Sequence, residues 1–73
     1  MKIGIIATYH DMVITAEKLR QRPGVQFMIS ESTYDEGVRE AERMRREGAD
    51  VIISRGATLN YIEQQCTIPT VSC

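Results

Sequence analysis

The stretch Asp50-Val51-Ile52-Ile53-Ser54-Arg55-Gly56-Ala57-Thr58 decides the fold class of this 73-residue chain. Its apolar run lies between Gly48 and Gly56 and carries apolar side chains on both faces, which predicts a parallel strand covered by helices. Open parallel sheets bind ligands at the carboxyl ends of their strands. The polar residues that follow the run are therefore where we expect a binding site.

Other apolar runs predict strands at 3–7, 25–29 and 68–73, and the segments between the runs have helical periodicity. Asp11, Thr33 and Thr58 are the residues expected to cap the three helices, with Glu36 completing a capping box at Thr33. Gly48 is expected to end the second helix. The predicted order is βαβαβαβ.

This order predicts a three-layer α/β/α fold with a four-stranded parallel sheet of order 2-1-3-4, a flavodoxin-like or periplasmic-binding-protein-like lobe. The last strand would be a bare edge, which favours pairing with another chain or another lobe. We therefore expect residues 1–73 to be the first part of a larger α/β domain, a single lobe truncated after the fourth strand, or a chain that forms a homodimer through that edge.

Composition narrows the class of protein. Nine Lys and Arg residues against ten Asp and Glu residues give a net charge of −1. Because the chain has no excess of positive charge to attract nucleic acid, direct nucleic-acid contact is not expected. The charges of 39–47 alternate in sign, which is typical of a solvated helix face. No signal peptide or membrane-spanning run is present, which favours the cytoplasm. Cys66 and Cys73 have neither redox-pair nor zinc-site spacing, so we expect free thiols, no metal and no cofactor.

The candidate site combines the ends of two strands that are neighbours in the predicted sheet. After the third strand come hydroxyls, a guanidinium and small residues whose backbone a ligand can approach, and after the first strand come a further hydroxyl and the sole histidine. A helix N-terminus at the same place would favour an anion. An exposed Arg55, a purely capping Thr58 and a surface His10 are the simpler alternatives. The predicted ligand-binding residues are Ser54, Arg55, Gly56, Ala57, Thr58, Thr8 and His10.

Motifs for catalysis are absent from the sequence. The sequence has a single histidine, so few pairings of a nucleophile with a general base are available. Neither a dinucleotide-binding fingerprint nor a P-loop occurs. Thr8-Tyr9 stands where a response-regulator receiver needs an acidic pair. The chain is therefore expected not to be an enzyme.

Residues 48–58, followed by Tyr61-Ile62 and Ile68-Pro69-Thr70-Val71, closely resemble the PrpR N-terminal domain family. That family is the sensory domain of propionate-catabolism activators and related sigma-54-dependent transcriptional regulators. The resemblance implies an effector-binding α/β domain of two similar lobes, placed ahead of an ATPase and a DNA-binding module. In the propionate activators it implies a 2-methylcitrate-type polycarboxylate as effector, which would suit Arg55.

Two other functions stay open from the residues alone. A racemase-like enzyme lobe also ends its strands in small polar loops around a carboxylate, but it needs two cysteines at the crevice. A pure dimerisation module would contribute only the surface of its fourth strand. The main expectation is a sensor that binds a small anionic effector.

Overall fold

The computed structural model describes all 73 residues, and its sheet has the predicted order. The four strands are parallel and lie in the order β2-β1-β3-β4. A short 3-10 turn at Leu19–Gln21 extends the first helix. The elements are β1 (Lys2–Ala7), α1 (His10–Lys18), β2 (Gln26–Glu31), α2 (Tyr34–Arg46), β3 (Val51–Ser54), α3 (Gly56–Gln65) and β4 (Thr70–Ser72).

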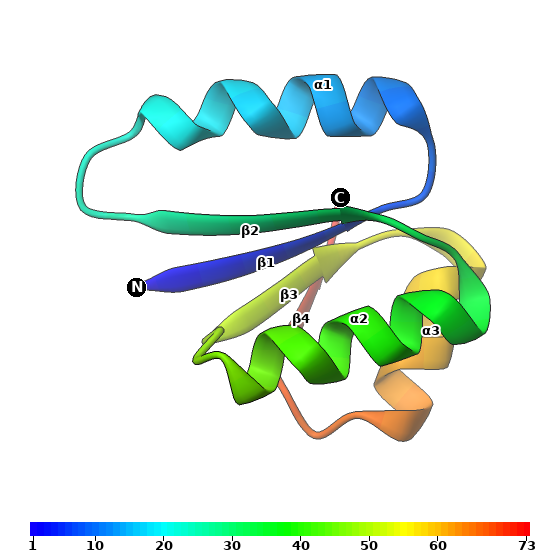
Figure 1. Ribbon diagram of the computed structural model, residues 1–73. Helices are drawn as coiled ribbons and strands as arrows, with labels where there is room; N and C mark the ends of the chain where they lie inside the picture. The colour runs from blue at the N-terminus through cyan, green and yellow to red at the C-terminus, as the bar shows by residue number, and fades with distance from the viewer.

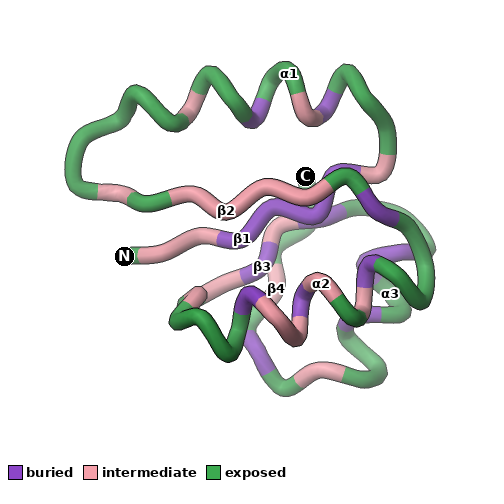
Figure 2. Tube along the Cα trace, in the orientation of Figure 1, coloured by how far each residue is buried: buried purple, intermediate pink, exposed green.

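The sheet is the middle of three layers, with α1 on one face and α2 and α3 on the other (Figure 1). Side chains alternate between the faces of β1, so Ile5 packs toward α1 while Ile6 packs toward α2 and α3. Buried residues concentrate along β1 and on the helix sides that face the sheet (Figure 2). The three-layer α/β/α prediction is therefore confirmed.

Two of the predicted helix caps are wrong, and one is right only in position. Tyr9, not Asp11, precedes α1, and Arg55, not Thr58, precedes α3. Thr33 does precede α2, but its side chain makes no capping hydrogen bond, so the capping box with Glu36 is absent. The Thr58 hydroxyl is engaged elsewhere, because it accepts the backbone N–H of a residue in α2.

The C-terminus of α2 ends at Gly48 as predicted. Gly48 has φ of 100°, its N–H donates to Arg45, and the N–H of Ala49 donates to Met44. These bonds form a Schellman motif, in which a glycine in the left-handed region satisfies the last carbonyl groups of a helix.

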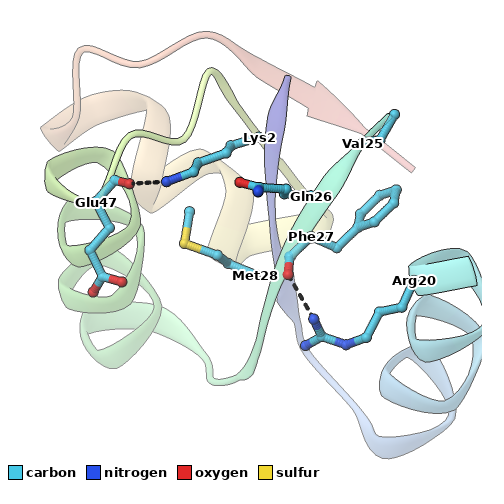
Figure 3. A pocket seen from close by; sticks show the side chains of 7 residues that line it. All are labelled: Lys2, Arg20, Val25, Gln26, Phe27, Met28 and Glu47. Atoms are coloured by element: carbon cyan, nitrogen blue, oxygen red, sulfur yellow. Dashed lines mark hydrogen bonds between the residues drawn. The ribbon is translucent and has the colours of Figure 1, made fainter. Parts of the chain in front are cut away.

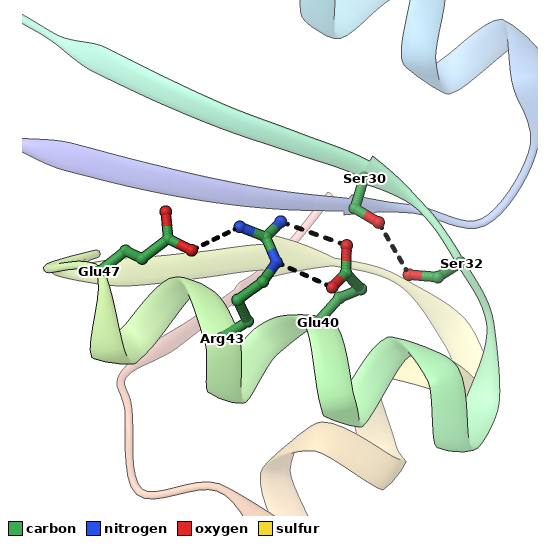
Figure 4. A network of polar contacts seen from close by, with 5 residues as sticks. All are labelled: Ser30, Ser32, Glu40, Arg43 and Glu47. Carbon is green, nitrogen blue, oxygen red and sulfur yellow. Dashed lines mark hydrogen bonds and ion pairs between the residues drawn. The ribbon is translucent and has the colours of Figure 1, made fainter.

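Part of the charge on α2 is paired between neighbouring turns of the helix. Arg43 donates hydrogen bonds to both carboxylate oxygens of Glu40, at 2.9 and 3.2 Å, and to the Glu47 carboxylate at 2.7 Å (Figure 4). The Arg43 guanidinium, and secondarily the Ser30 hydroxyl, hold the pKa of Glu40 below its usual range. These pairs have the i,i+3 and i,i+4 spacing of a solvated helix face. The guanidinium of Arg43 is therefore engaged by carboxylates of its own helix segment.

None of the helices has the length and apolar character needed to span a membrane.

Candidate functional site

A hollow of about 490 Å³ opens at the carboxyl edge of the sheet. It lies between the residues that follow β1, the start of α2 and the start of α3, which come together because β1 lies between β2 and β3. Its walls are formed by Thr8, Tyr9, Thr33, Tyr34, Arg55, Gly56, Ala57 and Thr58.

Arg55 is the only charged residue in the wall of this hollow. Its Nη1 donates to the Tyr9 hydroxyl at 2.9 Å, and no carboxylate lies within ion-pair distance of it. Arg20, Arg43 and Arg45, by contrast, each pair with a glutamate. The positive charge of Arg55 is therefore uncompensated and exposed to a ligand in the hollow.

The start of α3 presents backbone donors to the same space. Leu59 is the first residue whose N–H reaches back to the carbonyl of Arg55, at 3.3 Å, so the N–H groups of Gly56, Ala57 and Thr58 have no partner within the helix. The positive end of the helix dipole adds to the charge of Arg55. Gly56 adopts φ of 62°, a conformation that other residues rarely take.

A side chain from α3 fastens the start of α2. The N–H of Tyr34 donates to Thr58 Oγ1 at 3.1 Å, and Thr58 is 3% exposed. Tyr34 itself has φ of 48°, a left-handed backbone conformation that is uncommon for a bulky residue. The bond joins the first turns of both helices that border the hollow.

The predicted site residues divide into two groups. Most line the hollow: Thr8, Arg55, Gly56, Ala57 and Thr58. Ser54 is fully buried and donates its hydroxyl to the Ile6 carbonyl at 2.8 Å, so it supports the end of β3. His10 lies outside the lining, with Nδ1 3.2 Å from the Glu31 carboxylate.

Sequence reasoning missed three lining residues: Tyr9, Thr33 and Tyr34. Tyr9 stands between two residues that were proposed, so proximity along the chain could have identified it. Thr33 and Tyr34 follow β2, which the predicted strand order already placed beside β1. The carboxyl ends of all three strands form one rim, and that topological argument could have found them.

A second hollow, of about 540 Å³, lies at the end of the sheet where β1 and β2 begin. Its two cationic side chains already have hydrogen-bond partners. Lys2 Nζ donates to the Glu47 carbonyl at 2.9 Å, and Arg20 donates to the Phe27 carbonyl at 2.8 Å (Figure 3). Arg20 also pairs with the Glu17 carboxylate at 2.7 Å. These cations satisfy backbone carbonyls, so this hollow is a structural feature at the edge where parallel sheets do not usually bind ligands.

Other chemistry has little support in the structure. No group of three or more His, Cys, Asp and Glu side chains is placed to hold a metal ion. Both cysteines are free, and burial, with a smaller contribution from the Glu42 carboxylate, raises the pKa of the Cys66 thiol to about 11. A thiol with a raised pKa is a poor nucleophile at neutral pH.

Comparison with known proteins gives a family match and a structural match. The family model for the PrpR N-terminal domain, described as propionate catabolism activator, matches residues 21–73. The fold is similar to the crystal structure of an NtrC family transcriptional regulator from Clostridium acetobutylicum, with a TM-score of 0.84 and 26% identity. That alignment covers 99% of this chain and 38% of the other. No curated protein matched the sequence.

Proposed function

The chain belongs to the PrpR N-terminal domain family, and we propose that it is an effector-sensing lobe of a sigma-54-dependent transcriptional regulator that binds a small anionic metabolite, such as a carboxylate. The ligand occupies the hollow at the carboxyl edge of the sheet. The chain spans 38% of the NtrC family regulator to which its fold is similar, which supports a role as one lobe of a larger sensor.

The unpaired guanidinium of Arg55 is the observation that carries this proposal. A carboxylate in the hollow meets Arg55 in a two-pronged contact and also meets the free N–H groups at the start of α3. Thr8 and Thr33 add hydroxyls that can donate or accept. Every polar group that this anion needs comes from the wall of one hollow.

A sensor fits this wall better than an enzyme. The racemase-like alternative needs two thiols facing one substrate, but neither Cys66 nor Cys73 lines the hollow. Its wall holds no carboxylate and no histidine that could move a proton. Binding without chemistry is the simpler role, and the signal then arises from different affinities for two conformations of the regulator.

The β4 edge is the proposed place for a partner strand, from a second copy or from another lobe. Pro69 and Cys73 bond to β3, so the backbone groups of Thr70 and Ser72 point outward. Along β2, the other outer strand of the sheet, Arg20 covers the Phe27 carbonyl. Light scattering tests the homodimer form of this idea, and a strict monomer at high concentration would contradict it.

Calorimetric titration with citrate, succinate, propionate and benzoate tests the proposed function. Arg55→Ala should weaken whichever carboxylate binds by about 10- to 100-fold, because a hydrogen bond to a charged group contributes about 1.5–3 kcal/mol. Arg22→Ala removes the same charge from the exposed turn before β2 and should leave the affinity unchanged. Equal affinities for the native chain and Arg55→Ala would refute the role of Arg55.

A further inference from the structure

We infer that the ligand of this site is an aromatic monocarboxylate, whose ring is held by Tyr9 and Tyr34 while its carboxylate meets Arg55. The inference rests on the proposed function, since it specifies the chemical class of the anion. It rests on the charge of the wall, the placement of the aromatic residues and the backbone of Tyr34.

The charge of the wall matches one carboxylate. Arg55 is the only charged residue among those that line the hollow, so the protein offers a single positive charge and one set of helix N–H groups. A second or third carboxylate on the same ligand would have no cation to meet. An additional carboxylate would gain no ion pair from the wall, because Arg55 is its one cation. A monoanion is therefore favoured over a polycarboxylate.

All the tyrosines of the chain gather around this hollow. Tyr9 and Tyr34 line it, and Tyr61 contacts Tyr34 edge to face, with ring centroids 5.3 Å apart. The sequence has three tyrosines, no tryptophan and one phenylalanine, and that residue, Phe27, lines the hollow at the other edge. Every tyrosine at the site is more than a third exposed. Exposed aromatic surface beside a cation is suited to a ring that carries an anion.

The backbone of Tyr34 supports a binding role for this side chain. A left-handed φ of 48° is unfavourable for tyrosine, and glycine or asparagine would adopt it more easily. Thr58 Oγ1 holds the residue in place through its N–H. Backbone strain of this kind concentrates at functional sites, where the surrounding structure maintains it.

The contact between Arg55 and Tyr9 brings the proposed carboxylate position next to one aromatic ring of the wall. The Tyr9 hydroxyl receives Arg55 Nη1, and the guanidinium carbon lies 5.6 Å from the centroid of the Tyr9 ring. A carboxylate bound to Arg55 therefore lies beside Tyr9, and a ring attached to it extends toward the aromatic wall. A volume of about 490 Å³ is within the usual range for small-ligand sites.

The test compares benzoate with cyclohexanecarboxylate and citrate, using tyrosine fluorescence of the 73-residue chain and calorimetry. With no tryptophan present and every tyrosine at the site, the fluorescence reports this hollow. Benzoate should bind about three- to tenfold more tightly than cyclohexanecarboxylate, because aromatic pairs gain affinity beyond their buried area. Citrate should bind no more tightly than benzoate.

Substitutions of the tyrosines that line the hollow test whether they cause the preference for benzoate. Tyr9→Leu and Tyr34→Leu should bring the benzoate to cyclohexanecarboxylate ratio close to one, while Phe27→Leu, an aromatic change at the opposite edge, should preserve it. Tyr34→Asn should lose the ratio without lowering the melting temperature, because asparagine accepts the left-handed backbone. This variant separates loss of the ring contact from loss of the fold.

The outcomes distinguish this inference from the proposed function. Equal binding of benzoate and cyclohexanecarboxylate, with both weakened in Arg55→Ala, overturns the aromatic inference and retains the anion site. Tighter binding of citrate than of benzoate overturns the monoanion argument in the same way. Failure of every carboxylate to bind overturns both.

Discussion

The two faces of the sheet differ in how completely they are packed. Toward α2 and α3, the side chains of Ile6, Met44, Ile52 and Ile62 are fully buried. Toward α1, Ile53 is only half-buried and Val71 is 51% exposed. A single helix covers β1 and β2 on that face, leaving β3 and β4 partly open. We therefore expect the α2 and α3 face to contribute more to stability than the α1 face.

The open face also has its own apolar hollow, of about 210 Å³, between α1 and β3. Met12, Ala16 and Ile53 are among its walls, and Cys73 lies at its border. Because packing density sets the cost of losing a side chain, equivalent substitutions should have different effects on the two faces.

The largest contrast is expected between the neighbours Ile52 and Ile53, which point to opposite faces of β3. Ile52→Ala should lower the free energy of unfolding by about 3–4 kcal/mol, and Ile53→Ala by about 1–2 kcal/mol, since only Ile52 is fully enclosed. Urea denaturation followed by circular dichroism measures both. Equal losses would contradict the difference between the faces.

Gly4 tests how tightly the α2 and α3 face is filled. A Cβ at this position would lie 2.6 Å from Ile52 Cδ1 and 2.7 Å from Met44 Sδ, and both side chains are fully buried. Gly4→Ala should therefore cost about 1–3 kcal/mol of unfolding free energy. Ile52→Val removes Cδ1, so the double variant should lose less than the sum of the two single changes. A Gly4→Ala protein as stable as the parent would show unfilled space.

The pH dependence of stability should reflect the burial of Cys66 on the α2 and α3 face. Cys66 packs against the α2 and α3 core, and burial raises the pKa of its thiol to about 11. The native state thus favours the protonated thiol, so this contribution to stability is complete below the thiol's ordinary pKa of 9.0 and is lost as pH rises through about 11. Denaturation between pH 8 and 11 should show the decline, and Cys66→Ala should reduce it.

Thiol labelling gives an independent reading of the same contrast. Cys73 is exposed at the border of the open face, whereas Cys66 is partly covered. Iodoacetamide at pH 8 should modify Cys73 first, with mass spectrometry identifying the site. Preferential labelling of Cys66 would show that the crowded face opens more readily than its packing indicates.

The smallest effect is expected at Val71, on the open face of β4. Its side chain is 51% exposed, so Val71→Ala should change the unfolding free energy by less than about 0.5 kcal/mol. Urea denaturation again measures it. A loss above 1 kcal/mol would mean that the open face is covered in solution, and the concentration dependence of the transition would show whether a second copy covers it.

The strand order could be predicted because each strand has a distinct apolar run and because helical crossovers require parallel pairing. Helix starts could not be predicted as reliably. Threonine often caps helices, but the Thr58 hydroxyl accepts a hydrogen bond from the N–H of Tyr34, 24 positions away. Only the fold brings these two residues together. Local capping preference was outweighed by a tertiary contact.

The candidate site was predictable to the extent that topology alone places residues. Thr8 and Arg55 follow adjacent strands, so strand order was enough to place them at one hollow. The pairing of Arg55 with Tyr9 depends on side-chain geometry, and the left-handed backbone of Tyr34 is contrary to the preference of its residue type. Neither feature leaves a mark in composition or periodicity.

The close approach of α2 and α3 also has an evolutionary consequence. A Cβ on Gly37 would lie 2.7 Å from the Thr58 methyl group, while the hydroxyl of the same threonine holds Tyr34. Positions 37 and 58 should therefore vary together. A relative with alanine at 37 should have serine at 58, because serine lacks the methyl group and keeps the hydroxyl oxygen. Substitutions at these two positions should appear together in the history of the family.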